Sequence, residues 1–515
     1  MKGFPEQHGY WSITCVVVLL VTISHVHCWS PASRVFRSET NFQKRQRVHT
    51  TREAHRTDLL DVSSRYAQSV RTVRTAQPQP TRLPQAENSA PIVAAKQQTA
   101  GTIPKLTTSL VKSIVGSGIL ALPAGIATLG DSPDVIPYAI AIIGAVGAMN
   151  AYYFRLIGQV CQATGSTSYR EAWDRTVGAE KKEGETSASS NLVAVVVAMK
   201  TALACVAYSM ILADSFQSLG IAAGLTGLTR TEALVCVTGL VLLPLSLLQD
   251  LKALAPFALL GLVGMGAAGG AICLRHLDGS YVQGGQFWDD LARVPSFGST
   301  GPKIQGLVLA CTLATAFVAH YNAPRFHSEL DDNTPERFDT VVACSYGIAA
   351  LTFIIVASQG FLTFGSSSSS LILNSYSSYD PLITASRAAV AASILFAFPL
   401  PFVGLRDGTL DLLRVPDEER DEGTQITLSL LLLAGVTFAA TLTSDLGLVL
   451  SVGGGTLSTS IASVFPTLMY RAAATKDADK LDNPELHTKV SLGLMCISVA
   501  IGATGVWLAI DKALH

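Results

Sequence analysis

Charged residues are scarce in this chain. Asp, Glu, Lys and Arg make up 15% of its 515 residues, and hydrophobic residues make up 49%. An ordinary soluble domain carries about 25% charged residues. The remaining charges are crowded into a few stretches, so most of the chain is too apolar to be water-soluble. The formal net charge of −1 argues against nucleic acid as the main partner.

The sequence also lacks the signatures of catalysis and of metal binding. We find no nucleophile paired with a base and no phosphate loop in the apolar segments, so we predict neither an enzyme nor a cofactor. Asp289 and Asp290 follow Trp288 in a Gly-rich connection, where a carboxylate pair is hydrated surface, and we assign them no chemistry. The cysteines are widely separated and predict neither a disulfide framework nor a metal site; they are Cys15, Cys28, Cys161, Cys205, Cys236, Cys273, Cys311, Cys344 and Cys496.

The first hundred residues differ in composition from the rest. Residues 13–23 (ITCVVVLLVTI) are a short apolar core preceded by Lys2, which predicts a signal peptide over residues 1–28. Residues 29–57 are rich in Arg, Ser and Thr and poor in acids, as organelle transit peptides are. A signal followed by a transit-like stretch resembles the bipartite presequences of algae with complex plastids. The alternative is an endomembrane (vacuolar) protein with a disordered arm over residues 29–104, and both remain open.

The most informative apolar segment is 111–123 (VKSIVGSGILALP), which Gly116, Ser117 and Gly118 interrupt near its middle. Backbone groups freed at membrane depth must meet protein, a solvated cavity or a bound solute. A discontinuous helix of this kind is typical of the solute site of a secondary transporter. Close helix packing by small residues is the alternative reading of the same segment.

Eleven apolar segments of about the length that a bilayer requires follow from Thr107 onward. They span approximately 107–130, 135–160, 191–219, 231–248, 253–274, 304–326, 339–362, 380–405, 424–443, 446–470 and 489–510. Most Lys and Arg between them fall in alternate loops, which places the amino terminus on the inner side and the carboxyl terminus on the outer side. The outer side retains only Arg230, Arg275, Arg293, Lys303 and Lys512.

The sixth segment contains a second interruption. In FVAHYNAPRFHSEL (317–330), His320, Tyr321, Asn322 and Pro324 crowd an otherwise apolar span. Proline removes a backbone donor and clashes with the preceding turn, so the helix is expected to unwind near residues 319–324. If segments one to five and six to ten are inverted repeats, both first helices are broken, as a midplane site requires.

At this point the chain resembles the amino acid/auxin permease family, and within it the sodium-coupled neutral and vacuolar amino acid transporters. The resemblance covers residues 105–512, the predicted transporter domain, and rests on motifs that occur in order. These are KSIVGSGILALP (112–123), LPLSLLQDLKALAPFALLGL (243–262), AFVAHYNAPRFHSEL (316–330), GFLTFG (360–365), the Arg387 to Arg406 segment with Pro399, and 444–470.

The resemblance implies an all-α carrier of eleven helices with the five-plus-five inverted repeat of the leucine transporter fold, working by alternating access. It implies that the amides of Gly116, Ser117 and Gly118 bind the substrate carboxylate, which agrees with anion binding at half-helix amino termini. Other residues expected around the substrate are Ser113, Ile114, Tyr208, Val318, His320, Tyr321 and Asn322. For Tyr208 simple packing is the alternative.

Two positions depart from the sodium-coupled members. Lys112 and Ala397 stand where those members have an asparagine and a threonine that hold the ion, and neither residue can coordinate Na⁺. A lysine there resembles the proton-coupled branch, although snorkelling of Lys112 to the interface is the alternative. His320 has a side chain suited to proton exchange, or to hydrogen bonding alone. Asp214 is a further candidate for ion coupling, unless it lies at the outer interface.

These features predict a secondary active transporter of neutral amino acids that is proton-coupled or independent of Na⁺. The alternative from another class is a membrane sensor that binds an amino acid and signals through the amino-terminal arm. Cleavage of that arm as a presequence would remove the part that signals.

Overall fold

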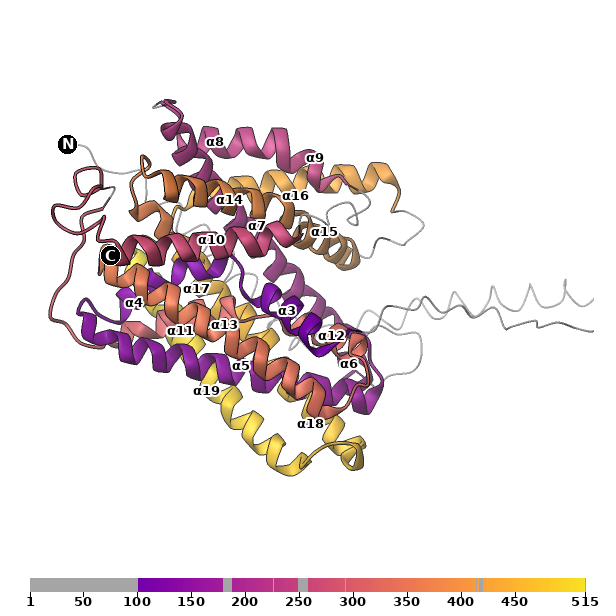
Figure 1. Cartoon of the computed structure of the whole chain (residues 1–515). Helices are drawn as coiled ribbons and strands as arrows, with labels where there is room; N and C mark the ends of the chain where they lie inside the picture. The colour runs from indigo at the N-terminus through magenta and orange to yellow at the C-terminus, as the bar shows by residue number, and fades with distance from the viewer. Residues whose placement is uncertain are drawn as a thin grey trace, which may run out of the picture. The chain divides into compact units, whose positions relative to one another are not determined.

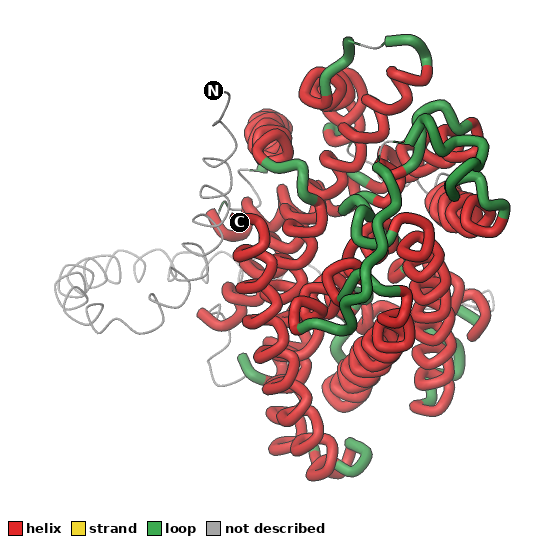
Figure 2. Tube along the Cα trace, turned by 90° about the vertical axis from the view of Figure 1, so that its left-hand side faces the viewer, coloured by secondary structure: helices red, strands yellow, loops and turns green. Residues whose placement is uncertain are grey.

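The structure, a computed structural model, describes residues 101–178, 188–225, 227–248, 258–291, 293–413, 415 and 420–514, which belong to one compact unit. The predicted signal peptide and nearly all of the transit-like region lie outside the described residues. The described part is helical without a β-strand (Figure 2). Its extended pairing is limited to two isolated bridges, Gly101 to Leu330 and Ser296 to Gly365.

The first half of the membrane domain begins with a broken helix and continues through four further segments (Figure 1). Its elements are α3 (Ile103–Ile114), η2 (Ser117–Ala121), α4 (Leu122–Leu129), η3 (Pro133–Val135), α5 (Ile136–Thr164), α6 (Tyr169–Thr176), α7 (Ala188–Ala222), α8 (Arg230–Val237), the π-helical η4 (Thr238–Leu242), α9 (Leu243–Ser246) and α10 (Ala258–Leu277).

The second half also begins with a broken helix, and it contains a π-helical stretch late in the chain. Its elements are η6 (Ile304–Gly306), α11 (Leu307–Ala316), η7 (His320–Asn322), α12 (Ala323–Glu329), α13 (Pro335–Phe364), η8 (Ile372–Ser375), α14 (Pro381–Ala397), α15 (Pro399–Leu413), α16 (Glu422–Leu442), α17 (Leu446–Gly453), η10 (Gly454–Ser458), η11 (Ser460–Val464), α18 (Phe465–Lys476), η12 (Ala478–Lys480) and α19 (Pro484–Leu514).

All eleven predicted segments contain helix, but fewer than eleven are long and apolar enough to be counted as membrane spans. Among the described residues there are eight such helices, or nine if α3 and η2–α4, bent by 44°, form one span. The two not counted are α8–η4–α9 and α10. They flank residues 249–257, which lie outside the described part, so each is described only up to that gap.

Several helices begin where the sequence provides a polar cap. The Ser168 hydroxyl accepts the Glu171 amide at the start of α6, and Thr229 forms a reciprocal capping box with Glu232 at α8. Asp380 accepts the amides of Leu382 and Ile383 at α14, where a proline occupies the first helical position. Such caps satisfy amides that have no partner inside the helix, so they fix where each helix starts.

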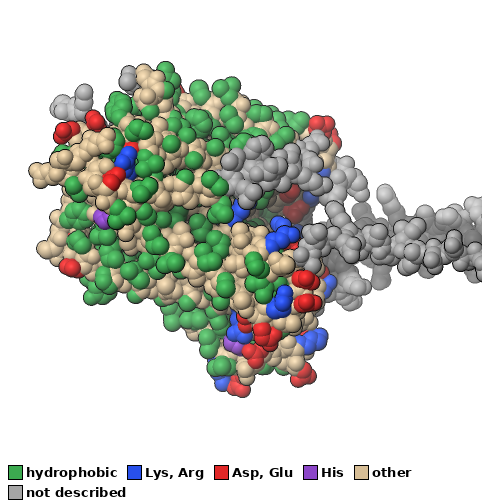
Figure 3. Space-filling model, in the orientation of Figure 1, with side chains coloured by type: hydrophobic (Ala, Val, Ile, Leu, Met, Phe, Trp, Pro, Cys, Tyr) green, Lys and Arg blue, Asp and Glu red, His purple; other side chains and the backbone are tan. Residues whose placement is uncertain are grey.

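The surface has the character expected of a membrane domain. Hydrophobic side chains cover most of the face in Figure 3, and charged ones gather at the end where α6, α12 and α18 lie. Large apolar residues are widely exposed on the helices, including Leu240, Val263, Leu351 and Phe438. An exposed apolar surface of this extent requires lipid as its solvent.

The two broken helices lie inside the bundle. α11 packs against η2 and α4, α3 packs against α13, and α17 with η10 packs against α11. Gly454 permits the last of these contacts, because a Cβ there would overlap the carbonyl oxygen of Cys311. Close backbone approach of this kind requires glycine.

Candidate functional site

The first helix is interrupted where the Gly-Ser-Gly sequence predicted. α3 ends at Ile114, and Gly116 is extended at φ −111° and ψ −164° before η2 begins at Ser117. The Gly116 amide donates to the Ile114 carbonyl at 2.9 Å. Ser117 and Gly118 are the first two residues of η2, so their amides lie at the amino terminus of this half-helix, where intrahelical acceptors run out. An amino terminus of this kind can donate to a solute or to water.

The sixth segment is also interrupted, as predicted, at a slightly earlier position than expected. α11 ends at Ala316, and Ala319 leaves the helical region at φ −133° and ψ 9° before η7 and α12 resume. Pro324 lies in the first turn of α12. A proline is tolerated there because an amide in the first turn has no helical acceptor, so Pro324 is compatible with the start of the second half-helix. The Val318 and Ala319 amides have no acceptor among the described backbone groups.

The two interruptions meet in space. A Cβ built on Gly118 would lie 3.3 Å from the Cβ of Ala316, at the end of α11. The amino terminus of one half-helix therefore touches the carboxyl terminus of another. Amides at a helix start attract an anion, and carbonyls at a helix end attract a cation. This junction can bind a zwitterion.

The space next to the junction is open. A Cβ built on Gly116 would meet no described atom within 4 Å. Tyr208 of α7 is half-buried, and its phenol lies near enough to that of Tyr321 for an electrostatic interaction. Tyr321 itself is 44% exposed. The structure therefore brings one predicted side chain of α7 close to the second interruption.

Four other residues predicted to surround the substrate are buried or already hydrogen-bonded, or lie at the end of η7. The Ser113 hydroxyl donates to the Ser109 carbonyl at 3.0 Å and is exposed. Val318 is buried, and Ile114 is buried in the last turn of α3. Asn322 is half-buried at the end of η7.

His320 is turned into the protein interior. It is fully buried, and its Nε2 donates to the Asn150 carbonyl of α5 at 3.0 Å. Its ring packs edge-on against Phe154 and lies tilted beside Tyr346 of α13. In the part of the chain that the structure describes, the ring Nδ1 has no hydrogen-bond partner. The side chain is thus held in the packing between α5 and α13.

The residues predicted to govern ion coupling are in separate environments. Lys112 is half-buried in the last turn of α3, which packs mainly against α13. Ala397 ends α14, which packs against α10 and α7. Asp214 has a fixed partner, because Arg230 Nε donates to it at 2.6 Å and Asn374 Nδ2 at 2.9 Å. The three candidates therefore have different packing neighbours.

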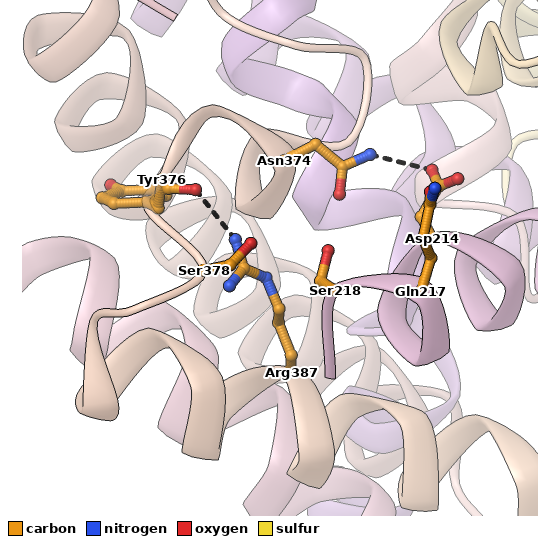
Figure 4. A pocket seen from close by; sticks show the side chains of 7 residues that line it. All are labelled: Asp214, Gln217, Ser218, Asn374, Tyr376, Ser378 and Arg387. Atoms are coloured by element: carbon orange, nitrogen blue, oxygen red, sulfur yellow. Dashed lines mark hydrogen bonds between the residues drawn. The ribbon is translucent and has the colours of Figure 1, made fainter. Parts of the chain in front are cut away.

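A polar pocket of about 250 Å³ lies beside Asp214 (Figure 4). It is lined by Asp214, Gln217 and Ser218 of α7, by Asn374, Tyr376 and Ser378 of the 365–380 connection, and by Arg387 of α14. In the predicted orientation this connection is on the outer side. Arg387 was not among the predicted site residues, although a charged side chain inside the apolar 380–405 segment indicates a functional position.

A second charged cluster supports the same connection from outside the pocket. Arg275 contacts Asp380 through two hydrogen bonds of 2.8 and 2.7 Å and also contacts Asp278. The Tyr281 hydroxyl donates to Asp380 at 3.0 Å. In sequence these groups are about one hundred residues apart, so only the fold reveals the cluster.

Comparison with known proteins identifies the family. The family model for transmembrane amino acid transporter proteins matches residues 99–511. Sodium-coupled neutral amino acid transporter 7 of Homo sapiens is 23% identical over 412 residues, 76% of this chain and 83% of that protein. Vacuolar amino acid transporter 5 of Schizosaccharomyces pombe is 23% identical over 299 residues, 57% of this chain and 69% of that protein.

A solved structure supports the fold. The inward facing conformation of Mhp1 has a TM-score of 0.50 and 14% identity, and covers 80% of this chain and 89% of that one. This likeness confirms the predicted all-helical, inverted-repeat membrane fold. The family match also confirms the resemblance read from the sequence, and relatives of this kind are transporters and not enzymes. The chain belongs to the transmembrane amino acid transporter family.

Proposed function

We propose that this chain is a secondary active transporter that moves neutral amino acids across a membrane by alternating access. The observation that carries the proposal is the contact between the two half-helices at Gly118 and Ala316. The Ser117 and Gly118 amides bind the substrate carboxylate there, and the carbonyls at the end of α11 face its ammonium group. Both ends of every α-amino acid are thus recognised by backbone groups, and the side chain points to the open space.

The preference for neutral substrates follows from the side chains near the junction. Tyr208 and Tyr321 are uncharged, and the His320 ring is hydrogen-bonded to α5, away from solvent. Lys112 is the charged side chain closest in sequence to the first interruption. Apart from Lys112, these residues offer no counter-charge to a substrate with a charged side chain.

For coupling, we propose that transport proceeds without Na⁺ and responds to a pH gradient. Lys112 has no ion-pair partner in the described structure, and its ammonium is near the carboxyl end of α3, where a cation is stabilised. Ala397 has no oxygen ligand to offer in its side chain. Several relatives are named sodium-coupled, so the Na⁺ requirement has to be measured directly.

Purified protein in proteoliposomes tests the function. A panel of labelled amino acids is offered with imposed Na⁺ and pH gradients, applied separately and together. We expect uptake of neutral amino acids in Na⁺-free buffer that a pH gradient accelerates. Uptake that collapses without Na⁺ and ignores the pH gradient would refute the coupling, and absence of uptake for every amino acid would refute the function.

The membrane in which the protein acts is an intracellular one in our proposal, either a plastid envelope or the vacuole. The transit-like composition of residues 29–57 favours the plastid, whereas a relative named as vacuolar favours the endomembrane system. A fluorescent reporter fused to residues 1–100 and expressed in an alga with complex plastids separates the two. The plastid reading fails if the reporter reaches the vacuole or the cell surface.

A further inference from the structure

The outer pocket has a buried cation at one end. Arg387 is 2% exposed and lines the pocket from α14. Its Nη1 donates to the Ser377 carbonyl at 3.2 Å, and its Nη2 donates to the carbonyls of Leu373 and Tyr376 at 2.7 and 2.9 Å. Its Nε has no hydrogen-bond partner among the described residues. The guanidinium is thus held in place by carbonyls that use three of its five N–H donors and leave the Nε–H free.

The charge of Arg387 is less well compensated than those of its neighbours. Arg230 directly contacts Asp214, and Arg275 directly contacts both Asp380 and Asp278. Asp380 is within electrostatic range of Arg387 but is bound by Arg275. Within the described structure Arg387 contacts no carboxylate. A buried guanidinium without a carboxylate partner favours an anion that can accept a hydrogen bond from its free Nε–H.

The opposite end of the pocket carries a negative group. Figure 4 shows Asp214 and Asn374 across the pocket from Arg387, with Ser218 between them. Asp214 is 9% exposed and keeps its bond to Arg230. A solute with a carboxylate at the Arg387 end and an ammonium at the Asp214 end matches this distribution of charge.

The pocket also lies next to the first interruption. η8, which contributes Asn374 to the pocket, packs against η2, which begins the second half of the broken first helix. In the predicted orientation the pocket is therefore between the outer solution and the junction of the half-helices. A solute that enters from the outer side passes this pocket first.

We propose that this pocket is an outer subsite that binds an amino acid before it reaches the junction, with Arg387 holding its carboxylate. The inference rests on the proposed transport function and adds to it a second binding position with its own recognition residue. Two binding positions in series would let a substrate be selected for its charges before the broken helices engage it.

Protection of an introduced cysteine tests the subsite. Ser218→Cys in the full-length chain, reconstituted in liposomes, is labelled from the outer side with a membrane-impermeant thiol reagent, and labelling of the wild-type chain is subtracted. The probes are L-alanine, propionate, ethylamine and chloride. We expect L-alanine and propionate to slow labelling, by about tenfold at about ten times their Kd. Ethylamine and chloride should leave the labelling rate unchanged.

The four probes distinguish a site for carboxylates from a site for any small anion or for an amine. Equal protection by chloride and propionate would overturn the proposal, because the site would then select a small anion and not a carboxylate. Absence of protection by L-alanine would also overturn it, and so would equal protection by ethylamine. Introducing Arg387→Lys into the cysteine chain should abolish protection, because lysine has no counterpart of the free Nε–H donor.

A second pair of variants keeps the test independent of folding. Ser218→Leu fills the pocket without removing a charged group, and we expect it to raise the KM for uptake from the outer side by about tenfold, equivalent to about 1.4 kcal/mol. Ser299→Leu makes the same change on an exposed outer loop and should leave KM unchanged. Equal effects of the two variants would contradict the subsite.

The subsite and the transport function can fail separately. Transport by the wild-type chain without protection at residue 218 would refute the subsite and leave the proposed function standing. Protection without any transport would refute the proposed function.

Discussion

Gly116→Val is the sharpest test of the junction between the half-helices. Gly116 has an extended backbone, which a β-branched residue adopts readily, and its Cβ would meet no described atom within 4 Å. We therefore expect the free energy of unfolding to change by no more than about 0.5 kcal/mol. The valine side chain would occupy the open space beside the Ser117 and Gly118 amides and keep the carboxylate away from them.

The size of the effect on transport follows from the lost hydrogen bonds. A hydrogen bond to a charged group contributes about 1.5–3 kcal/mol. Loss of one such bond should weaken binding by about 10- to 100-fold, since about 1.4 kcal/mol corresponds to a factor of ten. The assay is the initial rate of L-alanine uptake into proteoliposomes over a range of concentrations, with thermal unfolding of the same preparation measured in detergent.

Gly144→Val is the matched control. Gly144 is exposed on α5, and a Cβ there also meets no atom within 4 Å, so the same side chain is added where no solute is expected. Wild-type KM and rate for Gly116→Val would refute the assignment of this interruption to the substrate. Equal losses of uptake in both variants would attribute the effect to the added side chain in general.

Three further predictions concern packing, coupling and the outer cluster. Gly118→Val should lower both uptake and stability, the latter by about 1–3 kcal/mol, because a Cβ at residue 118 would lie only 3.3 Å from that of Ala316 before the valine methyl groups are added. Unchanged thermal unfolding of this variant would contradict the close contact. Lys112→Asn combined with Ala397→Thr should make uptake depend on Na⁺, because each change adds an oxygen ligand; uptake by the double variant that stays independent of Na⁺ would refute the assignment of these positions. Asp380→Asn should destabilise the chain by about 3–5 kcal/mol in thermal unfolding, because it leaves the Arg275 side chain without its buried partner. Asp278→Asn, at the exposed edge of the same arginine, should cost less than about 1 kcal/mol, and equal losses for the two would contradict the difference in burial.

The interruptions could be predicted from the sequence because their causes are local. Gly116, Ser117 and Gly118 stand together in an apolar run, and Pro324 follows polar residues in another. Each pattern is incompatible with an unbroken helix in lipid, whatever surrounds it. What the pattern did not specify is the exact end of each half-helix. Pro324 lies in the first turn of α12 and not within the break, because the helix resumes at Ala323 and a proline suits a first turn.

The orientation of side chains at the interruptions could not be predicted in the same way. His320 is adjacent in sequence to the open backbone of the second interruption, yet its ring bonds to the Asn150 carbonyl on another helix. That direction depends on the packing of α5 and α13, which no spacing in the sequence encodes. The roles assigned to His320 and to Lys112 remain predictions that uptake measurements have to test.

The outer pocket shows a different limit of sequence reasoning. Its residues come from α7, from the connection at 365–380 and from α14, so they are separated by more than one hundred residues in the chain. The connection carries a run of serines that predicts no fixed structure, and its backbone is held by the buried side chain of Arg387. Asp214 was identifiable as an acid inside an apolar span, but its partners, Arg230 and Asn374, were not.

The two candidate binding positions use opposite means to bind the same groups. At the junction the partners are backbone amides and carbonyls, which carry partial charges and do not titrate. At the pocket they are the full charges of Arg387 and Asp214, held by carbonyls and by Arg230. Full charges attract a zwitterion from solution over a longer range, whereas helix ends act only within about one turn. A substrate that enters from the outer side would therefore first be attracted over a longer range by the charges of the pocket. It would then be bound at the junction by backbone groups, which act over a short range and require a specific geometry.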